Sequence, residues 1–144
     1  MDTTPLTPWK RHLMLAAGLL LLVSSLAHSL LGWPQIRLQL VAAGVPEDLV
    51  GTLAAGWHFG GVAMAAFGVI VLLAWRRARH GDAAGLEAVA VVALAYLAFG
   101  TAAFVMRSFA PFFLIFIVPG AALAACVGFR RRLPGGARTV DRPR

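Results

Sequence analysis

The sequence predicts an all-α fold: a polytopic membrane protein built as a four-helix transmembrane bundle, with both termini in the cytoplasm. Its composition carries the first part of this prediction, because 60% of the 144 residues are hydrophobic and only 13% are charged. A soluble domain has about a quarter charged residues. The arrangement carries the second part, since the few charges lie in short clusters between long apolar stretches. Most of the surface is therefore expected to face the lipid bilayer.

Four apolar stretches have the length of a membrane-crossing helix, which needs about 20 residues to cross a hydrocarbon layer of about 30 Å. None of them contains Asp, Glu, Lys or Arg. None alternates with the period of two that a barrel strand requires. The predicted spans are residues 13–32, 50–75, 88–106 and 110–129.

The positions of the basic residues predict how the chain is threaded. If the four spans alternate in direction, eleven of the thirteen Lys and Arg residues lie on one side, and only Arg37 and Arg107 lie on the other. Cytoplasmic loops hold the excess of Lys and Arg. Residues 1–132 are therefore expected to form one four-span domain of a bacterial-type inner membrane. The eleven are Lys10, Arg11, Arg76, Arg77, Arg79, Arg130, Arg131, Arg132, Arg138, Arg142 and Arg144.

These basic clusters predict partners as well. Clusters that only flank apolar spans argue against nucleic acid and favour anionic lipid headgroups. Residues 133–144, which are basic and rich in Pro and Gly, are expected to be a disordered cytoplasmic tail drawn to such lipids. The single cysteine, Cys126, lies within a span and has no second cysteine to pair with. It is expected to be a buried, inert thiol.

The first span has a second interpretation. Basic residues precede its apolar core, and the small residues Ser25 and Ala27 stand where a signal peptidase requires them. Cleavage after Ala27 would leave three spans. The apolar run continues to Trp33, a residue suited to the membrane interface, and this favours an uncleaved first span.

The connection between the first two spans is predicted to contain a short helix. Ile36, Leu40 and Ala43 share one helical face, and Gly44 is suited to end the helix. We expect this helix to lie on the outer membrane surface. Pro46 and the acidic residues after it have the composition of a first helical turn. The second long helix is therefore expected to begin near Pro46 and to project beyond the bilayer.

Small residues predict how the helices pack. Gly56 and Gly60 form a GxxxG pattern that Gly61 and Ala65 extend, and such residues let helix backbones approach closely in lipid. The second span is therefore expected to be central to the bundle. Pro119 lacks an amide hydrogen and is expected to kink the fourth span.

Two histidines lie within spans at the same predicted depth. His28 comes 17 residues after Arg11, and His58 comes 18 residues before Arg76. At about 1.5 Å per residue both lie roughly 25 to 27 Å from the cytoplasmic boundary. Ionisable side chains are costly inside a membrane and are therefore candidates for function.

The histidine layer predicts a ligand pocket towards the outer face. Two imidazoles in an apolar, aromatic space are suited to a haem iron, or to a soft metal ion with Met106 as third ligand. A small apolar molecule is a further candidate. Tyr96 is expected to donate its hydroxyl to a neighbouring helix. The residues expected around His28 and His58 as pocket walls are Ser24, Ser25, Trp57, Phe104, Phe112 and Phe113.

Three alternatives stay open at this stage. The histidines can join helices by hydrogen bonds to carbonyl or hydroxyl groups. The chain can act as an oligomeric, proton-linked transporter or exporter. It can also be an accessory subunit of a membrane complex, without a ligand. An enzyme is the least supported class, because the sequence holds no nucleophile–base pair, phosphate loop or paired carboxylates.

Overall fold

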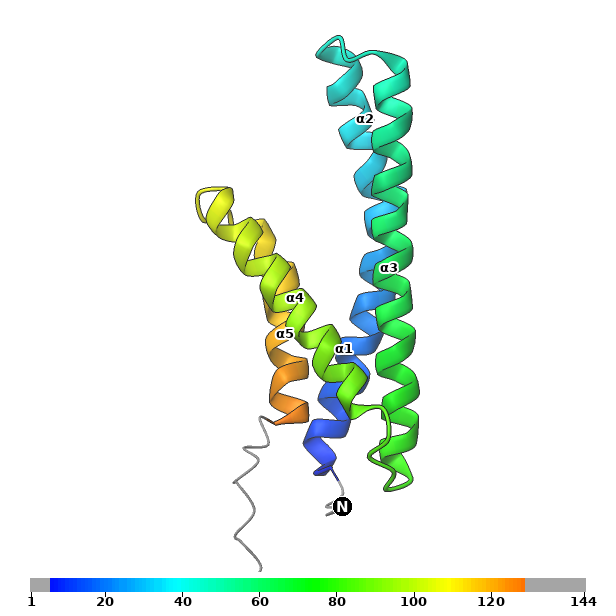
Figure 1. Cartoon of the computed structure of the whole chain (residues 1–144), viewed down its shortest axis with the longest axis vertical. Coiled ribbons are helices and arrows are strands. Elements are labelled where there is room, and N and C mark those ends of the chain that lie inside the picture. Colours follow the sequence, from blue (N-terminus) through cyan, green and yellow to red (C-terminus); the bar gives the residue numbers. More distant parts are fainter. Residues whose placement is uncertain (1–5, 129–144) are drawn as a thin grey trace, which may run out of the picture.

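A computed structural model describes residues 6–128 and shows only helices and turns there (Figure 1). The predicted tail, residues 133–144, and the basic residues from Arg130 onwards lie outside the described residues. Two short non-α segments are included, a π-helical η1 and a 3-10 helical η2. The elements are α1 (Pro8–Ala27), η1 (His28–Gly32), α2 (Trp33–Ala42), α3 (Glu47–Arg79), α4 (Leu86–Met106), η2 (Pro111–Phe113) and α5 (Leu114–Val127).

The first helix is longer than its predicted span. α1, η1 and α2 form one continuous helix, Pro8–Ala42, of 35 residues. It is about 52 Å long at 1.5 Å per residue, which exceeds a hydrocarbon layer of about 30 Å. The prediction of a separate short helix in the connection between the first two spans is therefore wrong, because α2 continues α1. No turn separates α2 from α1. Pro34 has no amide hydrogen, and the wider π turn of η1 directly before it lets the helix continue.

The turn between α2 and α3 is the one that the sequence predicts. Gly44 has a φ of 74° and donates its amide to Val41, while the Val45 amide donates to Leu40, both at 3.0 Å. This pair of bonds is the Schellman motif, in which glycine tolerates the left-handed conformation. Pro46 then caps α3, and two acidic residues occupy its first turn.

Two helical hairpins make up the molecule, α1 with α3 and α4 with α5. They meet at the end where the N-terminus lies and diverge towards the other end (Figure 1). α1 approaches α3 and α5, and α4 approaches α3 and α5, but no close backbone approach joins α1 to α4 or α3 to α5. The prediction that the second span is central is therefore wrong, because α3 has no more neighbouring long helices than the others have.

Each hairpin is tight because glycines face the neighbouring helix. A Cβ atom added at Gly68 on α3 would lie 2.9 Å from Leu22 and 3.1 Å from the carbonyl oxygen of Gly18 on α1. In the other hairpin, a Cβ atom at Gly100 would lie 2.9 Å from Phe116. The predicted GxxxG pattern marks this contact only in part. A Cβ atom at Gly60 would lie 3.4 Å from Nε2 of His28, and one at Gly61 would lie 3.6 Å from the Ser25 carbonyl oxygen, whereas one at Gly56 would meet nothing within 4 Å.

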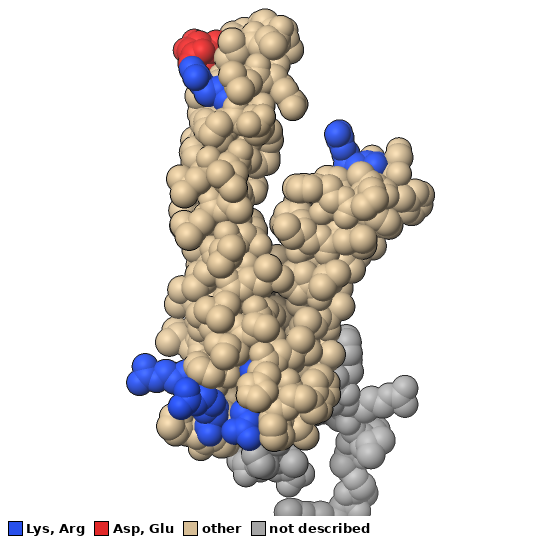
Figure 2. Space-filling view, turned by 180° about the vertical axis from the view of Figure 1, so that it is seen from behind, with Lys and Arg blue, Asp and Glu red and all other residues tan. Residues whose placement is uncertain are grey.

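The buried core lies in the half of the molecule where the hairpins meet. The Cys126 thiol is fully buried there and donates to the Lys10 carbonyl at 3.4 Å, so its predicted burial is confirmed. Lys and Arg side chains gather at this end of the molecule (Figure 2). The core consists of Met14, Ala17, Leu21, Val71, Ala74, Ala78, Val89, Val92, Ala93, Tyr96, Leu123 and Cys126.

Three helices are long and apolar enough to cross a membrane, Pro8–Ala42, Glu47–Arg79 and Leu86–Met106. The fourth predicted span corresponds to a shorter apolar helix, Pro111–Val127. It begins with a 3-10 turn at a proline and ends before Gly128, which has a φ of 63°. The predicted four-helix transmembrane bundle is therefore confirmed only as an all-helical chain with three helices of spanning length.

Candidate functional site

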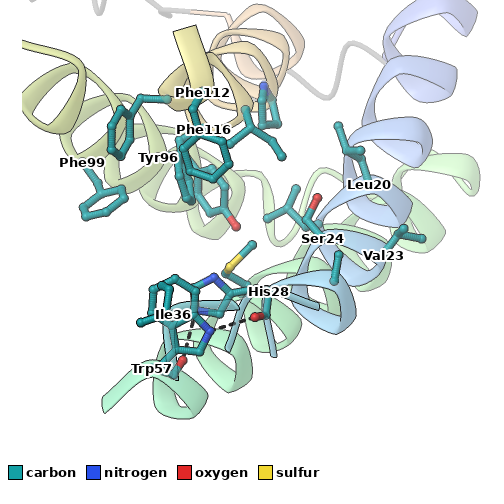
Figure 3. A pocket seen from close by; sticks show the side chains of 17 residues that line it. Leu20, Val23, Ser24, His28, Ile36, Trp57, Tyr96, Phe99, Phe112 and Phe116 are labelled. Atoms are coloured by element: carbon teal, nitrogen blue, oxygen red, sulfur yellow. Dashed lines mark hydrogen bonds between the residues drawn. The ribbon is translucent and has the colours of Figure 1, made fainter. Parts of the chain in front are cut away.

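A cavity of about 530 Å³ lies where the two hairpins part. α1, η1, α2 and α3 line one side of it, and α4, η2 and α5 line the other (Figure 3). Its volume falls in the range of about 300–1,000 Å³ that is typical of small-molecule sites. None of its lining residues is Asp, Glu, Lys or Arg. The cavity is therefore suited to a neutral, largely apolar molecule.

Few polar side chains line this cavity, whereas aromatic side chains come from both hairpins. The polar ones are Ser24 and His28 from the first helix, the indole of Trp57 from α3, and the hydroxyl of Tyr96 from α4. This combination of an apolar wall with a few polar groups is typical of sites that orient a ligand. The aromatic residues are Trp57, Tyr96, Phe99, Phe112, Phe113 and Phe116.

His28 and Trp57 join α3 to the π segment of the first helix. Nε2 of His28 lies 3.1 Å from the Trp57 carbonyl oxygen, and the Trp57 indole donates to the His28 carbonyl at 2.7 Å. The two rings stack with centroids 4.1 Å apart and planes 3° apart. A carbonyl oxygen only accepts, so Nε2 carries the proton in this arrangement. Each ring thus binds the backbone of the other residue.

Neighbouring residues extend this contact along the hairpin. The Ser25 hydroxyl donates to the Gly61 carbonyl at 2.8 Å. A Cβ atom at Gly32 would lie 3.0 Å from the Trp57 ring, so glycine leaves room for the indole. Because lipid offers no competing hydrogen bonds, these polar contacts hold the two helices in one register.

Tyr96 brings an unpaired hydroxyl to the opposite side of the cavity. The residue is only 6% exposed, and its hydroxyl has no hydrogen-bond partner in the part of the chain that the structure describes. The expectation that it donates to a neighbouring helix is therefore wrong. Phe67 and Phe116 pack near its ring, with centroids 6.1 and 6.0 Å away, and neither offers an acceptor. Figure 3 shows the hydroxyl directed into the space between the hairpins.

The structure brings five of the predicted site residues to the cavity: Ser24, His28, Trp57, Phe112 and Phe113. The others lie elsewhere. Ser25 is in the contact between α1 and α3.

The remaining predicted residues do not line the cavity. His58 is exposed and lies against Trp33, with ring centroids 5.9 Å apart. Phe104 packs against Phe109. Met106 is 82% exposed at the end of α4, where the hairpins are far apart (Figure 1).

The positions of His28, His58 and Met106 do not match the predicted haem or metal site. His28 uses Nε2 and one ring face to bind Trp57, and His58 is not in the same cavity. α4, which ends with Met106, has no close approach to η1. Residues 6–128 contain no group of three or more His, Cys, Asp or Glu that could hold a metal ion. The arrangement fits neither a bis-histidine haem nor a His, His and Met metal site.

Sequence reasoning missed Tyr96, Phe99 and Phe116 as cavity residues. The sequence spacing of these aromatic residues could have indicated a shared aromatic face. Tyr96 and Phe99 are three residues apart, and Phe112 and Phe116 are four apart, so each pair shares a helix face. The rotation of α4 and α5 relative to the first hairpin decides which face lines the cavity, and spacing alone does not give it.

Comparisons with family models, with curated proteins and with solved structures found no match for this chain.

The contact between His28 and Trp57 predicts the effect of a matched pair of substitutions. Trp57→Phe keeps an apolar ring but removes the donor to the His28 carbonyl, and it should lower the free energy of unfolding by about 1 kcal/mol. Trp33→Phe makes the same chemical change at an indole that donates to no group in the described residues, and it should cost less than half as much. Denaturant unfolding in micelles, followed by circular dichroism, measures both. Equal losses of unfolding free energy in the two variants would show that the hydrogen bond from Trp57 to the His28 carbonyl does not stabilise the protein.

Proposed function

We propose that this chain is a small multi-pass membrane protein that binds a small apolar molecule between its two hairpins. The observation that carries the proposal is the aromatic-lined cavity of about 530 Å³ at the point where the hairpins part, which no Asp, Glu, Lys or Arg lines. An apolar molecule that fits this space gains dispersion contacts with the aliphatic and aromatic side chains that line it.

The geometry favours this ligand over the other candidates. Haem and soft metals need imidazoles that face one centre, whereas His28 binds Trp57 and His58 lies against Trp33. Proton-linked transport needs ionisable groups along a path, and no acidic side chain lines the cavity. The role that we assign to His28 is to join two helices. An accessory subunit without a ligand is the outcome that a negative binding result would favour.

We further propose that four helices cross a bacterial-type inner membrane with both termini in the cytoplasm. The end where the hairpins meet carries Lys10, Arg11 and the three arginines that end α3, and Figure 2 shows these charges together. Among the Lys and Arg residues that the structure describes, only Arg37 and Arg107 lie at the opposite ends of the helices. The excess of positive charge supports a cytoplasmic location for the shared end. The shorter fourth helix fits if the bilayer thins locally.

Cysteine labelling tests this topology. In a Cys126→Ala background, Ala43→Cys and Ser108→Cys place a thiol in each of the two outer turns, and Ala83→Cys places one in the turn between α3 and α4. A membrane-impermeant maleimide added to intact spheroplasts should label the first two variants and leave the third unlabelled until the membrane is opened. Labelling of Ala83→Cys in intact spheroplasts, or protection of Ser108→Cys there, would contradict the topology.

Native mass spectrometry tests the binding proposal. Protein purified in mild detergent should carry one apolar molecule per chain. Ala27→Phe adds a phenyl group at a residue that lines the cavity and should abolish this adduct. Val62→Phe adds the same group on an exposed face of α3 outside the cavity and should keep it. Adducts lost equally, or kept equally, in the two variants would count against the cavity as the site.

A further inference from the structure

The Tyr96 hydroxyl is the one fully buried side-chain polar atom that residues 6–128 leave without a hydrogen-bond partner, and Tyr96 lines the cavity. It is buried and unpaired, and an unpaired buried hydroxyl costs about 1–3 kcal/mol. A phenylalanine would pack between Phe67 and Phe116 equally well and would avoid this cost. The hydroxyl is therefore best explained by an acceptor that does not belong to residues 6–128.

The depth of Tyr96 restricts what the acceptor can be. Tyr96 is the eleventh residue of the 21-residue helix α4, so it lies near the middle of a helix that crosses the hydrocarbon layer. The ester carbonyl groups of phospholipids lie at the edge of that layer, about 15 Å from its centre for a layer of about 30 Å. An acyl chain of an ordinary phospholipid presents no acceptor at the depth of Tyr96.

The aromatic walls restrict the shape of the ligand. Rings from both hairpins line the cavity around Tyr96, with Trp57 on one side and Phe99, Phe112 and Phe116 on the other. Figure 3 shows Phe99, Phe112 and Phe116 on the same side of the space as the Tyr96 ring, and Trp57 across the space, next to His28. Aromatic pairs contribute about 0.5–1.5 kcal/mol beyond their buried area. A planar ring gains this contribution, whereas a saturated chain does not.

We infer that the ligand is a planar ring system with a carbonyl oxygen that accepts a hydrogen bond from Tyr96, the chemistry of the membrane quinones. This inference rests on the proposed function and specifies the class of molecule that the cavity takes. Tyr96 fixes the oxygen, and the aromatic side chains of both hairpins enclose the ring. No covalent or redox step is part of the inference.

Two compounds of nearly the same shape provide the test. The first is 2,3-dimethyl-1,4-naphthoquinone, which has no free quinone position to which Cys126 could add. The second is 2,3-dimethylnaphthalene, which has the same ring system without the carbonyl groups. Isothermal titration calorimetry of the protein in lipid nanodiscs, with empty nanodiscs subtracted, gives the dissociation constant of each compound.

Tyr96→Phe should weaken the binding of the quinone about fivefold and leave the binding of the hydrocarbon unchanged, because a net neutral hydrogen bond contributes about 1 kcal/mol. Thr52→Val removes a hydroxyl of α3 that bonds to the Asp48 carbonyl outside the cavity. It should change neither dissociation constant. Thermal unfolding of each variant shows that the fold is retained.

The other outcomes overturn the inference in distinguishable ways. If Tyr96→Phe changes the binding of both compounds equally, or of neither, the carbonyl contact is refuted while the binding site remains. If the wild-type chain binds neither compound but carries an apolar adduct in mass spectrometry, the ligand class is refuted and the proposed function stands. If it binds neither and carries no adduct, both fail.

Discussion

The close approach of helix backbones within each hairpin is the constraint on which the rest of this structure depends. Apolar side chains gain little by leaving lipid for one another, so helices in a membrane associate where small residues permit close packing and a few polar bonds. Gly18 and Gly68 supply that approach for α1 and α3, and Gly100 and Gly120 supply it for α4 and α5. Hydrogen bonds from Ser25 and Trp57 then fix the register of the longer hairpin.

The cavity follows from how these two tight units combine. They share a core only at the basic end, where α1 meets α5 and α3 meets α4. Farther along, each hairpin keeps its own pairing and the two diverge (Figure 1). The large aromatic side chains of α4, η2 and α5 face this opening, and Tyr96 stands at the boundary between the core and the cavity. The apolar cavity is thus a consequence of helix packing.

Sequence reasoning predicted those features that depend on local chemistry. Apolar length predicted the long helices, and Gly44 and Pro46 predicted the turn between α2 and α3. Five residues of the expected pocket line the cavity. The reasoning failed where tertiary geometry decides. His58 is adjacent to Trp57 in sequence, yet a rotation of about 100° per residue turns it to Trp33 instead of the cavity. Of the predicted GxxxG pattern, Gly60 faces the first helix and Gly56 does not. The place of Tyr96 in the cavity depends on the rotation of α4 relative to the first hairpin.

Unfolding of two glycine variants tests the central claim most directly, because both carry the same change in one helix. Gly68→Ala places a methyl group against Leu22 and the Gly18 backbone and should lower the free energy of unfolding by about 1–3 kcal/mol. Gly56→Ala meets nothing within 4 Å and should leave it unchanged or raise it by about 0.5–1 kcal/mol, since alanine favours helix. An unchanged free energy of unfolding in Gly68→Ala, or equal losses in both variants, would contradict the close packing of α1 against α3.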